Sequence, residues 1–224
     1  MKTETEENIV SREDAAHRHY PLHPLISVRR SPRAFSEQPV EPEKLRSILE
    51  AARWAPSANN IQPWRFIVAA KDRREDRERM VSLLVDGNKT WAAKAPVLIL
   101  SVAQVTDPAS RKVNRFAFHD VGLETENLVL QATSVGLATH MMGGFHADRA
   151  KAAFNIPAEY EPVAVIAVGY EGGAEFLPKP LLERELAPRV RKPLPEFVFD
   201  NTWDVPSAIA EIEQTNILNK PISN

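Results

Sequence analysis

A nearly unbroken aliphatic run at residues 97–102 is the strongest constraint on the fold of this chain. Such a run, without polar alternation, is typical of a β-strand that is buried on both faces. Residues 163–168 repeat this pattern and end at Gly169. A third strand is predicted over residues 65–70, where Phe66, Ile67 and Val68 form the apolar centre.

A long helical pattern occupies residues 115–135. Apolar positions recur there at spacings of three and four, and Gly136 follows as the predicted C-cap. A stripe of this kind predicts a helix that is central to the core or to a subunit interface. The stripe consists of Phe118, Val121, Thr125, Leu128, Ala132 and Val135. Further helices are predicted over residues 42–54, 72–85, 148–154 and 207–218.

Strands and helices are intermixed, without internal repeats or an internal linker, which predicts a single α+β domain. We expect a mobile N-terminal arm over residues 1–20, the domain over residues 21–204 and a C-terminal extension over residues 205–224. Residues 172–195 contain five of the 18 prolines and no clear periodicity. This segment is therefore predicted to be extended over the surface.

The composition excludes several classes of function. Lys and Arg total 28 against 30 Asp and Glu, so the formal net charge is -2, which argues against a nucleic-acid or membrane partner. The absence of cysteine excludes disulfides, thiolate metal sites and a cysteine nucleophile. No apolar run is long enough to span a bilayer, and the polar N-terminus lacks the core of a signal peptide. We expect a cytoplasmic protein.

Three histidines, His17, His19 and His23, lie close together near the N-terminus. Their spacing allows a metal site, but no helix or closed loop would aim the three rings at one ion. A surface arm is the favoured interpretation, and we predict no bound metal.

A cluster of cations precedes the first long helix. Arg29, Arg30 and Arg33 flank Ser31, and guanidinium groups bind phosphate oxygens two at a time while a hydroxyl adds a further donor. The cluster indicates a socket for a phosphorylated small molecule. A solvated basic surface is the alternative.

Three other segments are more specific than core packing requires. Residues 55–66 form a polar loop between prolines that could present fixed donors and acceptors to a heteroaromatic ring, or could be an ordinary turn. Residues 141–145 contain the adjacent pair Gly143 and Gly144, which could bring main-chain N–H groups against a flat ligand, or could simply be a loop. Residues 189–195 carry further cations that could converge on the same phosphate, or could form a solvated turn. No Gly-x-Gly-x-x-Gly motif occurs.

These segments together resemble the nitroreductase family of FMN-dependent NAD(P)H oxidoreductases. The family pattern Arg-Arg-Ser-x-Arg-x-Phe matches residues 29–35, and Pro-Ser-x-x-Asn-x-Gln-Pro-Trp matches residues 56–64. Residues 95–99, 136–144 and 161–170 also fit, in the correct order. The similarity covers roughly residues 22–203.

The resemblance implies a three-layer α/β/α fold with a central, mostly antiparallel sheet, in an intertwined homodimer that binds FMN at the subunit interface. It implies that Arg33 faces the pyrimidine edge of the flavin and that a Gly143 or Gly144 N–H contacts flavin N5. The implied phosphate ligands are Arg29, Arg30 and Ser31, with Arg189 or Arg191 from the C-terminal part. The other implied cofactor-binding residues are Pro56, Ser57, Asn60 and Gln62, some of them from the partner subunit, and Asn88 and Met142 beside the ring.

The implied reaction transfers hydride from NADH or NADPH through flavin N5 to a small organic acceptor such as a nitroaromatic or a quinone, in a ping-pong cycle. No catalytic side chain is expected, because the cofactor carries the chemistry. The chain departs from the family pattern at Ala58, where a second serine is common, and at Gly143, where several relatives have an acidic residue. Lys89 and Lys94 both lie near the place of another basic family residue.

Two alternatives belong to the same fold or the same cofactor. One is a flavin dehalogenase or a flavin-fragmenting enzyme, although residues 107–115 contain no convincing copy of the dehalogenase lid. The other is a non-catalytic flavin-binding protein.

Overall fold

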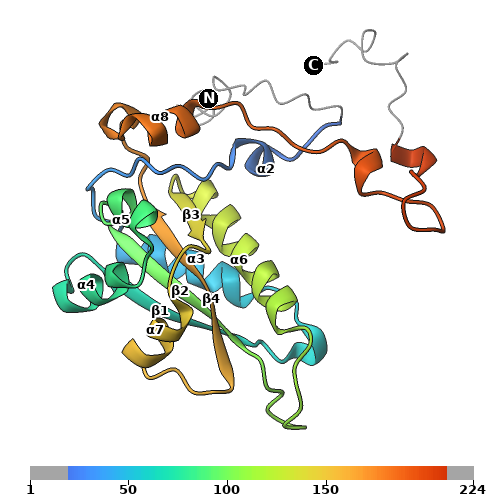
Figure 1. The fold of residues 1–224 in the computed structure, drawn as a ribbon, viewed down its shortest axis with the longest axis horizontal. Coiled ribbons are helices and arrows are strands. Elements are labelled where there is room, and N and C mark those ends of the chain that lie inside the picture. Colours follow the sequence, from blue (N-terminus) through green and yellow to red (C-terminus); the bar gives the residue numbers. More distant parts are fainter. Residues whose placement is uncertain (1–19, 211–224) are drawn as a thin grey trace. The chain divides into compact units, whose positions relative to one another are not determined.

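The computed structural model describes residues 20–210 of the 224 (Figure 1). This part of the chain forms two compact units. One unit is Pro24–Glu185, and the other contains the described residues on either side of it. The predicted domain boundaries remain predictions. The predicted mobile arm lies almost wholly outside the described residues. Most of the helix predicted over residues 207–218 also lies outside them, and residues 208–210 form a 3₁₀ turn.

A four-stranded antiparallel sheet lies at the centre of the Pro24–Glu185 unit, in the order β1-β2-β4-β3. The strands are β1 (Trp64–Ala70), β2 (Val97–Gln104), β3 (Ala138–Met142) and β4 (Tyr160–Gly169). Every residue of β2 is buried, and Ile99 lies opposite both Val68 and Ile166. The three predicted strands, including the two of the buried type, are confirmed.

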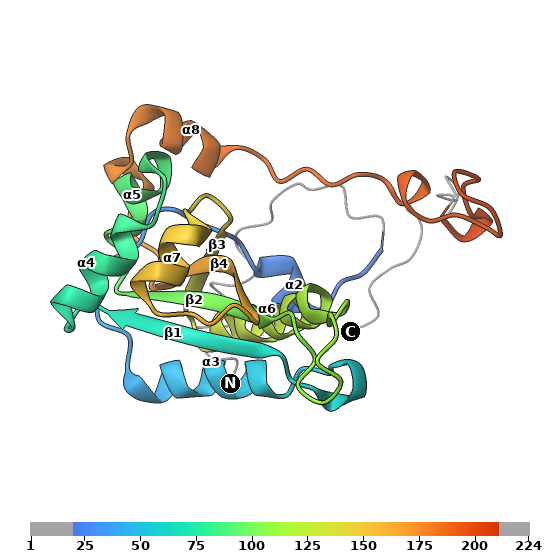
Figure 2. The same cartoon turned by 60° about the horizontal axis from the view of Figure 1, so that its bottom comes forward.

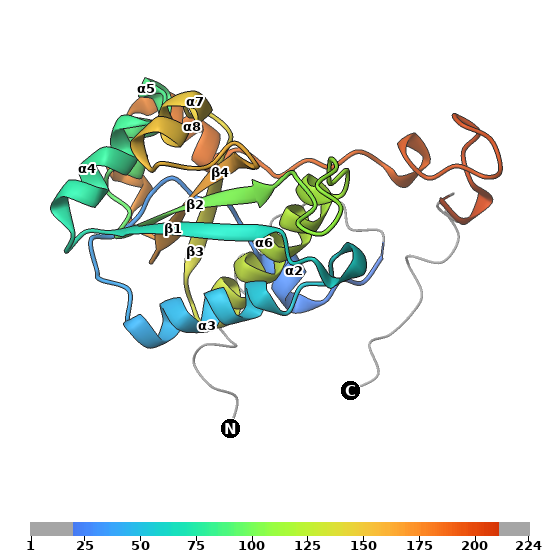
Figure 3. The ribbon, with the colours of Figure 1, turned by 90° about the horizontal axis from the view of Figure 1, so that it is seen from below.

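Helices cover both faces of this sheet (Figures 2 and 3). The helices α3 (Pro42–Arg53) and α6 (Ala117–Ser134) pack together on one face, and the helices α4 (Arg74–Ser82), α5 (Asp86–Ala92) and α7 (Ala147–Ala153) lie on the other. The predicted three-layer α+β fold is therefore confirmed. The remaining α-helices are α2 (Pro24–Val28) and α8 (Lys179–Leu186), and short 3₁₀ turns occupy Ala58–Asn60, Ala174–Phe176, Leu194–Glu196 and Ala208–Ala210.

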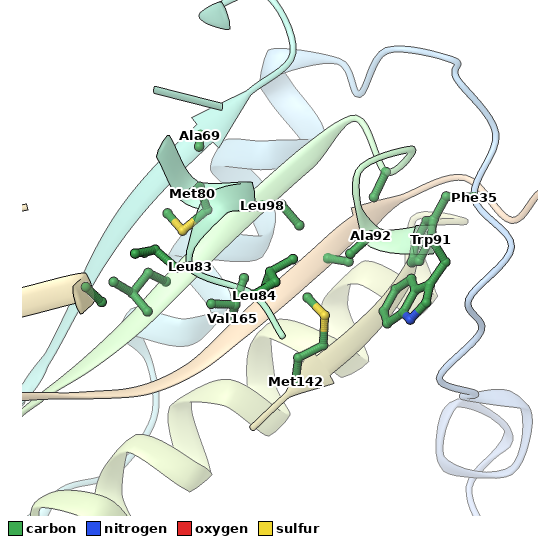
Figure 4. Packing of buried hydrophobic residues seen from close by; sticks show 14 of the residues in the cluster. Phe35, Ala69, Met80, Leu83, Leu84, Trp91, Ala92, Leu98, Met142 and Val165 are labelled. Carbon is green, nitrogen blue, oxygen red and sulfur yellow. The ribbon is translucent and has the colours of Figure 1, made fainter. Parts of the chain in front are cut away.

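Three apolar clusters hold the layers together in the described part of the chain, and two of them meet along β2. Along β2, Val97 and Ile99 pack towards α3 and α6, whereas Leu98 and Leu100 pack towards α4 and α5. This alternation explains why the strand is apolar at every position, since each of its faces meets a helical layer. Figure 4 shows the second of these clusters, in which Met80, Leu83, Leu84, Trp91, Met142 and Val165 meet.

Helix α6 ends in a Schellman motif. The Leu137 N–H donates to the Ala132 carbonyl at 2.8 Å, and the Gly136 N–H donates to the Thr133 carbonyl at 3.2 Å. Gly136 has a φ of 77°, which a glycine adopts without the Cβ penalty of other residues. The predicted glycine at the end of this helix is confirmed, one position beyond the C-cap residue Val135.

Three expectations were wrong or incomplete. Residues 172–195 are not wholly extended, because they contain α8. Pro180 occupies the first turn of that helix, where its missing N–H costs nothing, and Leu181 and Leu182 pack against the core. The predicted helix over residues 72–85 is shorter and is followed by a second one, α5. Met141 and Met142 belong to β3 rather than to a loop. No helix within residues 20–210 is both long and apolar enough to cross a membrane.

A buried carboxyl group lies between α6 and β2. The Glu124 side chain is fully buried, and its Oε1 accepts hydrogen bonds from the hydroxyls of Ser101 at 3.1 Å and Thr125 at 3.0 Å. Its Oε2 has no hydrogen-bond partner among the described residues. Burial raises the pKa of Glu124 to about 7, although the two hydroxyls act in the opposite direction.

This pKa makes stability depend on pH. Because the pKa of Glu124 is raised in the folded state, its protonated side chain contributes fully to stability below the ordinary pKa of 4.5. This contribution is lost as the pH rises through about 7. We expect Glu124→Gln to reduce the difference in unfolding free energy between pH 5 and pH 8 by about 2.5 kcal/mol. Urea unfolding at both pH values measures this difference, with the exposed Glu126→Gln as the control. An unchanged pH dependence would contradict the assignment.

Candidate functional site

The arginine cluster lies beside β3 and the end of α6. The Arg29 Nη1 lies 3.3 Å from the Ser31 Oγ. A hollow of about 150 Å³ is lined by Arg29 and Arg30 together with Gly136 and Leu137. The two guanidinium groups and the nearby hydroxyl form a donor set suited to a phosphate.

The backbone of residues 31–33 is held from two sides. The His140 Nδ1, on β3, lies 2.8 Å from the Ser31 carbonyl oxygen and 3.1 Å from that of Pro32. On the other side, the Arg33 N–H donates to both carboxylate oxygens of Glu185, at 3.0 and 3.1 Å. The segment that carries the arginines is thus fixed to β3 and to α8.

The surroundings of His140 disfavour a positive charge on its ring. Carbonyl oxygens only accept hydrogen bonds, so the Nδ1 carries a proton. Burial lowers the pKa of His140, and the nearby positive charge of Arg33 lowers it further. The ring packs on Trp91, with 4.5 Å between centroids, and Trp91 stacks on Phe35 at 6.2 Å. Figure 4 shows Trp91 beside Phe35.

The glycine pair follows β3 directly. The Gly144 carbonyl accepts hydrogen bonds from the Asn88 Nδ2 at 3.0 Å and from the Val85 N–H at 3.1 Å. A Cβ at Gly144 would lie 2.7 Å from the Asn88 Nδ2, whereas a Cβ at Gly143 would meet no atom within 4 Å. Within the described part of the chain, neither glycine N–H donates to a backbone carbonyl. The side chain of Met142 is buried in the core, so a contact from this residue would come from its main chain.

The loop at residues 56–62 has an unusual backbone. Asn59, Asn60 and Gln62 have φ angles of 52°, 54° and 52°, in the left-handed region that favours glycine. Such residues persist only where the surroundings hold them, and they cluster at functional sites. Here the Asp120 carboxylate accepts the Ala58 N–H at 3.0 Å, and the Ser57 Oγ accepts the Gln62 N–H at 3.0 Å.

The structure brings together only part of the predicted site. Residues 29–33, Asn88 and the glycine pair gather around β3. The loop at residues 56–62 leads into β1, at the opposite edge of the sheet. Arg189 and Arg191 belong to the other compact unit, so their predicted role as phosphate ligands stays a prediction.

The two lysines near the site differ in their surroundings. Lys89 pairs with Asp86 at 3.2 Å on α5. Lys94 lines a hollow of about 270 Å³ together with Arg33, Phe35 and Gly172. A further hollow of about 620 Å³, between the start of α3 and the end of β1, contains none of the predicted site residues.

Three supporting residues were missed by the sequence analysis: His140, Glu185 and Asp120. Their roles depend on contacts with segments distant in the chain, and none of them lies in a motif. A buried charge is an unusual feature, but the burial of Glu185 depends on the packing of α8, which the sequence pattern does not indicate.

The donor set around β3 fits FMN. The phosphate end of that cofactor needs cationic donors, which Arg29 and Arg30 supply. Its flat ring needs main-chain N–H groups that are not already paired with a backbone carbonyl, and within residues 20–210 the glycine pair has such groups. Arg33 adds a third cation to the segment that contains Arg29 and Arg30.

Comparison with known proteins identifies the family of this chain. The model of the nitroreductase family matches residues 26–86 and 73–170. A Streptococcus pyogenes protein provisionally named an NAD(P)H nitroreductase is 30% identical over 180 residues, which cover 65% of this chain and 88% of that protein. A Thermus thermophilus protein named NADH dehydrogenase is 28% identical over 173 residues, covering 63% and 82%. The crystal structure of an oxidoreductase containing FMN has a TM-score of 0.80 and 37% identity, covering 86% of this chain and 98% of that one.

Proposed function

Because the chain belongs to the nitroreductase family, we propose that it is an oxidoreductase that binds FMN and uses NADH or NADPH to reduce a small organic acceptor. The observation that carries this proposal is the gathering of Arg29, Arg30 and Arg33 with the two unused glycine N–H groups around β3. FMN held there would supply the hydride-accepting atom N5, and the expected acceptors are nitroaromatics and quinones. We expect the protein to act in the cytoplasm.

Each side chain then has a binding or orienting role. Arg29, Arg30 and Ser31 hold the phosphate, while Arg33 stabilises the negative charge that develops at the pyrimidine edge. Asn88 fixes the Gly144 carbonyl and so orients the glycine N–H groups towards the ring. The electron donor, NADH or NADPH, and the organic electron acceptor are expected to occupy the same place in turn, which would give ping-pong kinetics.

A homodimer completes the proposed site. Helix α6 and its N-terminal approach expose Phe116, Phe118 and Leu123, with exposed fractions of 44%, 56% and 36%, and Trp54 beyond α3 is 73% exposed. Exposed aromatic side chains of this kind mark protein interfaces. We infer that a second copy covers them and brings its loop at residues 56–62 to the β3 edge of the first.

Spectroscopy tests this function directly. The purified protein should be yellow or should take up FMN, and its absorption band near about 450 nm should bleach anaerobically with NADH or NADPH. A quinone or a nitroaromatic should restore the band. Retained colour without bleaching would favour a non-catalytic flavin-binding protein, and failure to bind FMN would refute the proposal.

Arg29→Ala tests the phosphate end. We expect FMN to bind about 10- to 150-fold more weakly, because a charge-assisted hydrogen bond worth about 1.5–3 kcal/mol is removed. Fluorescence titration of free FMN measures the dissociation constant. Arg46→Ala is the control, since that arginine is exposed on α3 and pairs with Glu43. If Arg29→Ala holds FMN as tightly as the wild type, the assignment is wrong.

A further inference from the structure

Glu185 contacts two of the arginines in the cluster. Its carboxylate accepts the Arg33 N–H with both oxygens, and its Oε2 lies 3.7 Å from the Arg33 Nη1. Its own carbonyl oxygen accepts a hydrogen bond from the Arg30 Nη2 at 3.1 Å. A single residue of α8 therefore fixes the segment between the predicted phosphate and pyrimidine contacts.

The negative charge of Glu185 is more than this fixation requires. A neutral amide could also accept the Arg33 N–H, through its single oxygen. The Glu185 side chain is only 8% exposed, and that of Arg33 is 25% exposed, so solvent screens their interaction less than it would on the surface. A carboxylate in this place partly offsets the positive charge of Arg33.

We propose that Glu185 is a positioning residue that orients Arg33 and lowers the reduction potential of the bound flavin by offsetting the charge of Arg33. The inference rests on the proposed function. Transfer of a hydride to the ring adds two electrons and one proton, and negative charge develops at the pyrimidine edge. Arg33 stabilises that charge, and the nearby carboxylate opposes it. The potential is thus set by the pair rather than by the arginine alone.

Glu185→Gln separates the charge from the hydrogen bond. The amide oxygen of the new side chain still accepts the Arg33 N–H, so the dissociation constant of FMN should change by less than about tenfold. The two-electron reduction equilibrium should shift about tenfold towards the reduced form, which raises the midpoint potential by about 30 mV. Anaerobic titration against a dye of known potential measures this shift.

Two companion variants control the experiment. Glu183→Gln removes an exposed charge from the same helix. Its two-electron reduction equilibrium should stay within a few-fold of that of the wild type. Glu185→Asp keeps the charge, so the potential should stay near that of the wild type even if FMN binds more weakly. A Glu185→Gln protein that binds FMN with an unchanged potential would overturn the inference.

The pair can also be tested by a substitution of Arg33. If Glu185→Gln does not fold, Arg33→Gln leaves the carboxylate in place without its cation and should lower the potential. An unchanged potential in that variant would equally overturn the inference. Failure of the proposed function is recognised separately, because the wild-type protein would then bind no FMN.

Discussion

Trp91→Ala is expected to lower the free energy of unfolding by about 3–5 kcal/mol, as for other large aromatic side chains removed from a core. Trp91 is 1% exposed and lies in the cluster between α5 and the sheet. It also contacts Phe35, which ends the arginine motif, and His140, which holds the Ser31 and Pro32 carbonyls. The substitution should therefore weaken FMN binding as well as stability.

Urea unfolding and FMN titration measure these two effects. Trp203→Ala is the matched control in stability measurements, because Trp203 is 85% exposed and its loss should cost the folded chain far less. Addition of excess FMN should recover less stability in Trp91→Ala than in the wild type, since binding is weakened too. Equal unfolding free energies for the two tryptophan variants would contradict the packing described above.

Heterodimers should recover flavin at FMN concentrations that are too low for either parent variant to bind it. One chain carries Arg29→Ala, and the other carries Asn60→Ala together with Gln62→Ala, so that each homodimer lacks one half of both sites. If the loop acts across the interface, the heterodimer has one intact site and one site with both defects. It should hold about half the flavin of the wild-type dimer, because one of two symmetric sites is restored.

Two affinity tags isolate the heterodimer, and its absorbance gives the flavin content. The matched control pairs Arg29→Ala with Ser31→Ala, two substitutions in the same half of the site, and should recover no flavin. Recovery in the control, or its absence from the test pair, would show that the loop does not act on the partner's site. A protein that remains monomeric would refute the dimer itself.

Most of the fold could be predicted from periodicity. Residues 97–102 are apolar at each position because helices cover both faces, and the stripe on α6 is long enough to be unambiguous. The strand β3 and the helix α8 could not be predicted in this way. The short strand β3 contains a histidine and a threonine, and the prolines around α8 obscure its apolar face. In both places tertiary contacts decide the structure.

The candidate site was predicted as separate motifs, and the structure explains how some of them are connected. Asn88 and Gly144 are far apart in the sequence but form a hydrogen bond. Glu185 and His140 hold the arginine segment, yet nothing in the motif indicates either partner. Contacts between segments far apart in the sequence depend on the packing of α8 and β3, which local patterns do not encode.

The left-handed backbone of the loop at residues 56–62 has a consequence for protein engineering. Glycine would relieve about 1 kcal/mol of strain at each such position, partly offset by the greater freedom of glycine in the unfolded chain. At Asn60 and Gln62 the relief would remove amide groups that we assign to cofactor binding. Asn59 has no such assignment, and it is therefore the position in this loop where thermostability can be raised without a loss of flavin.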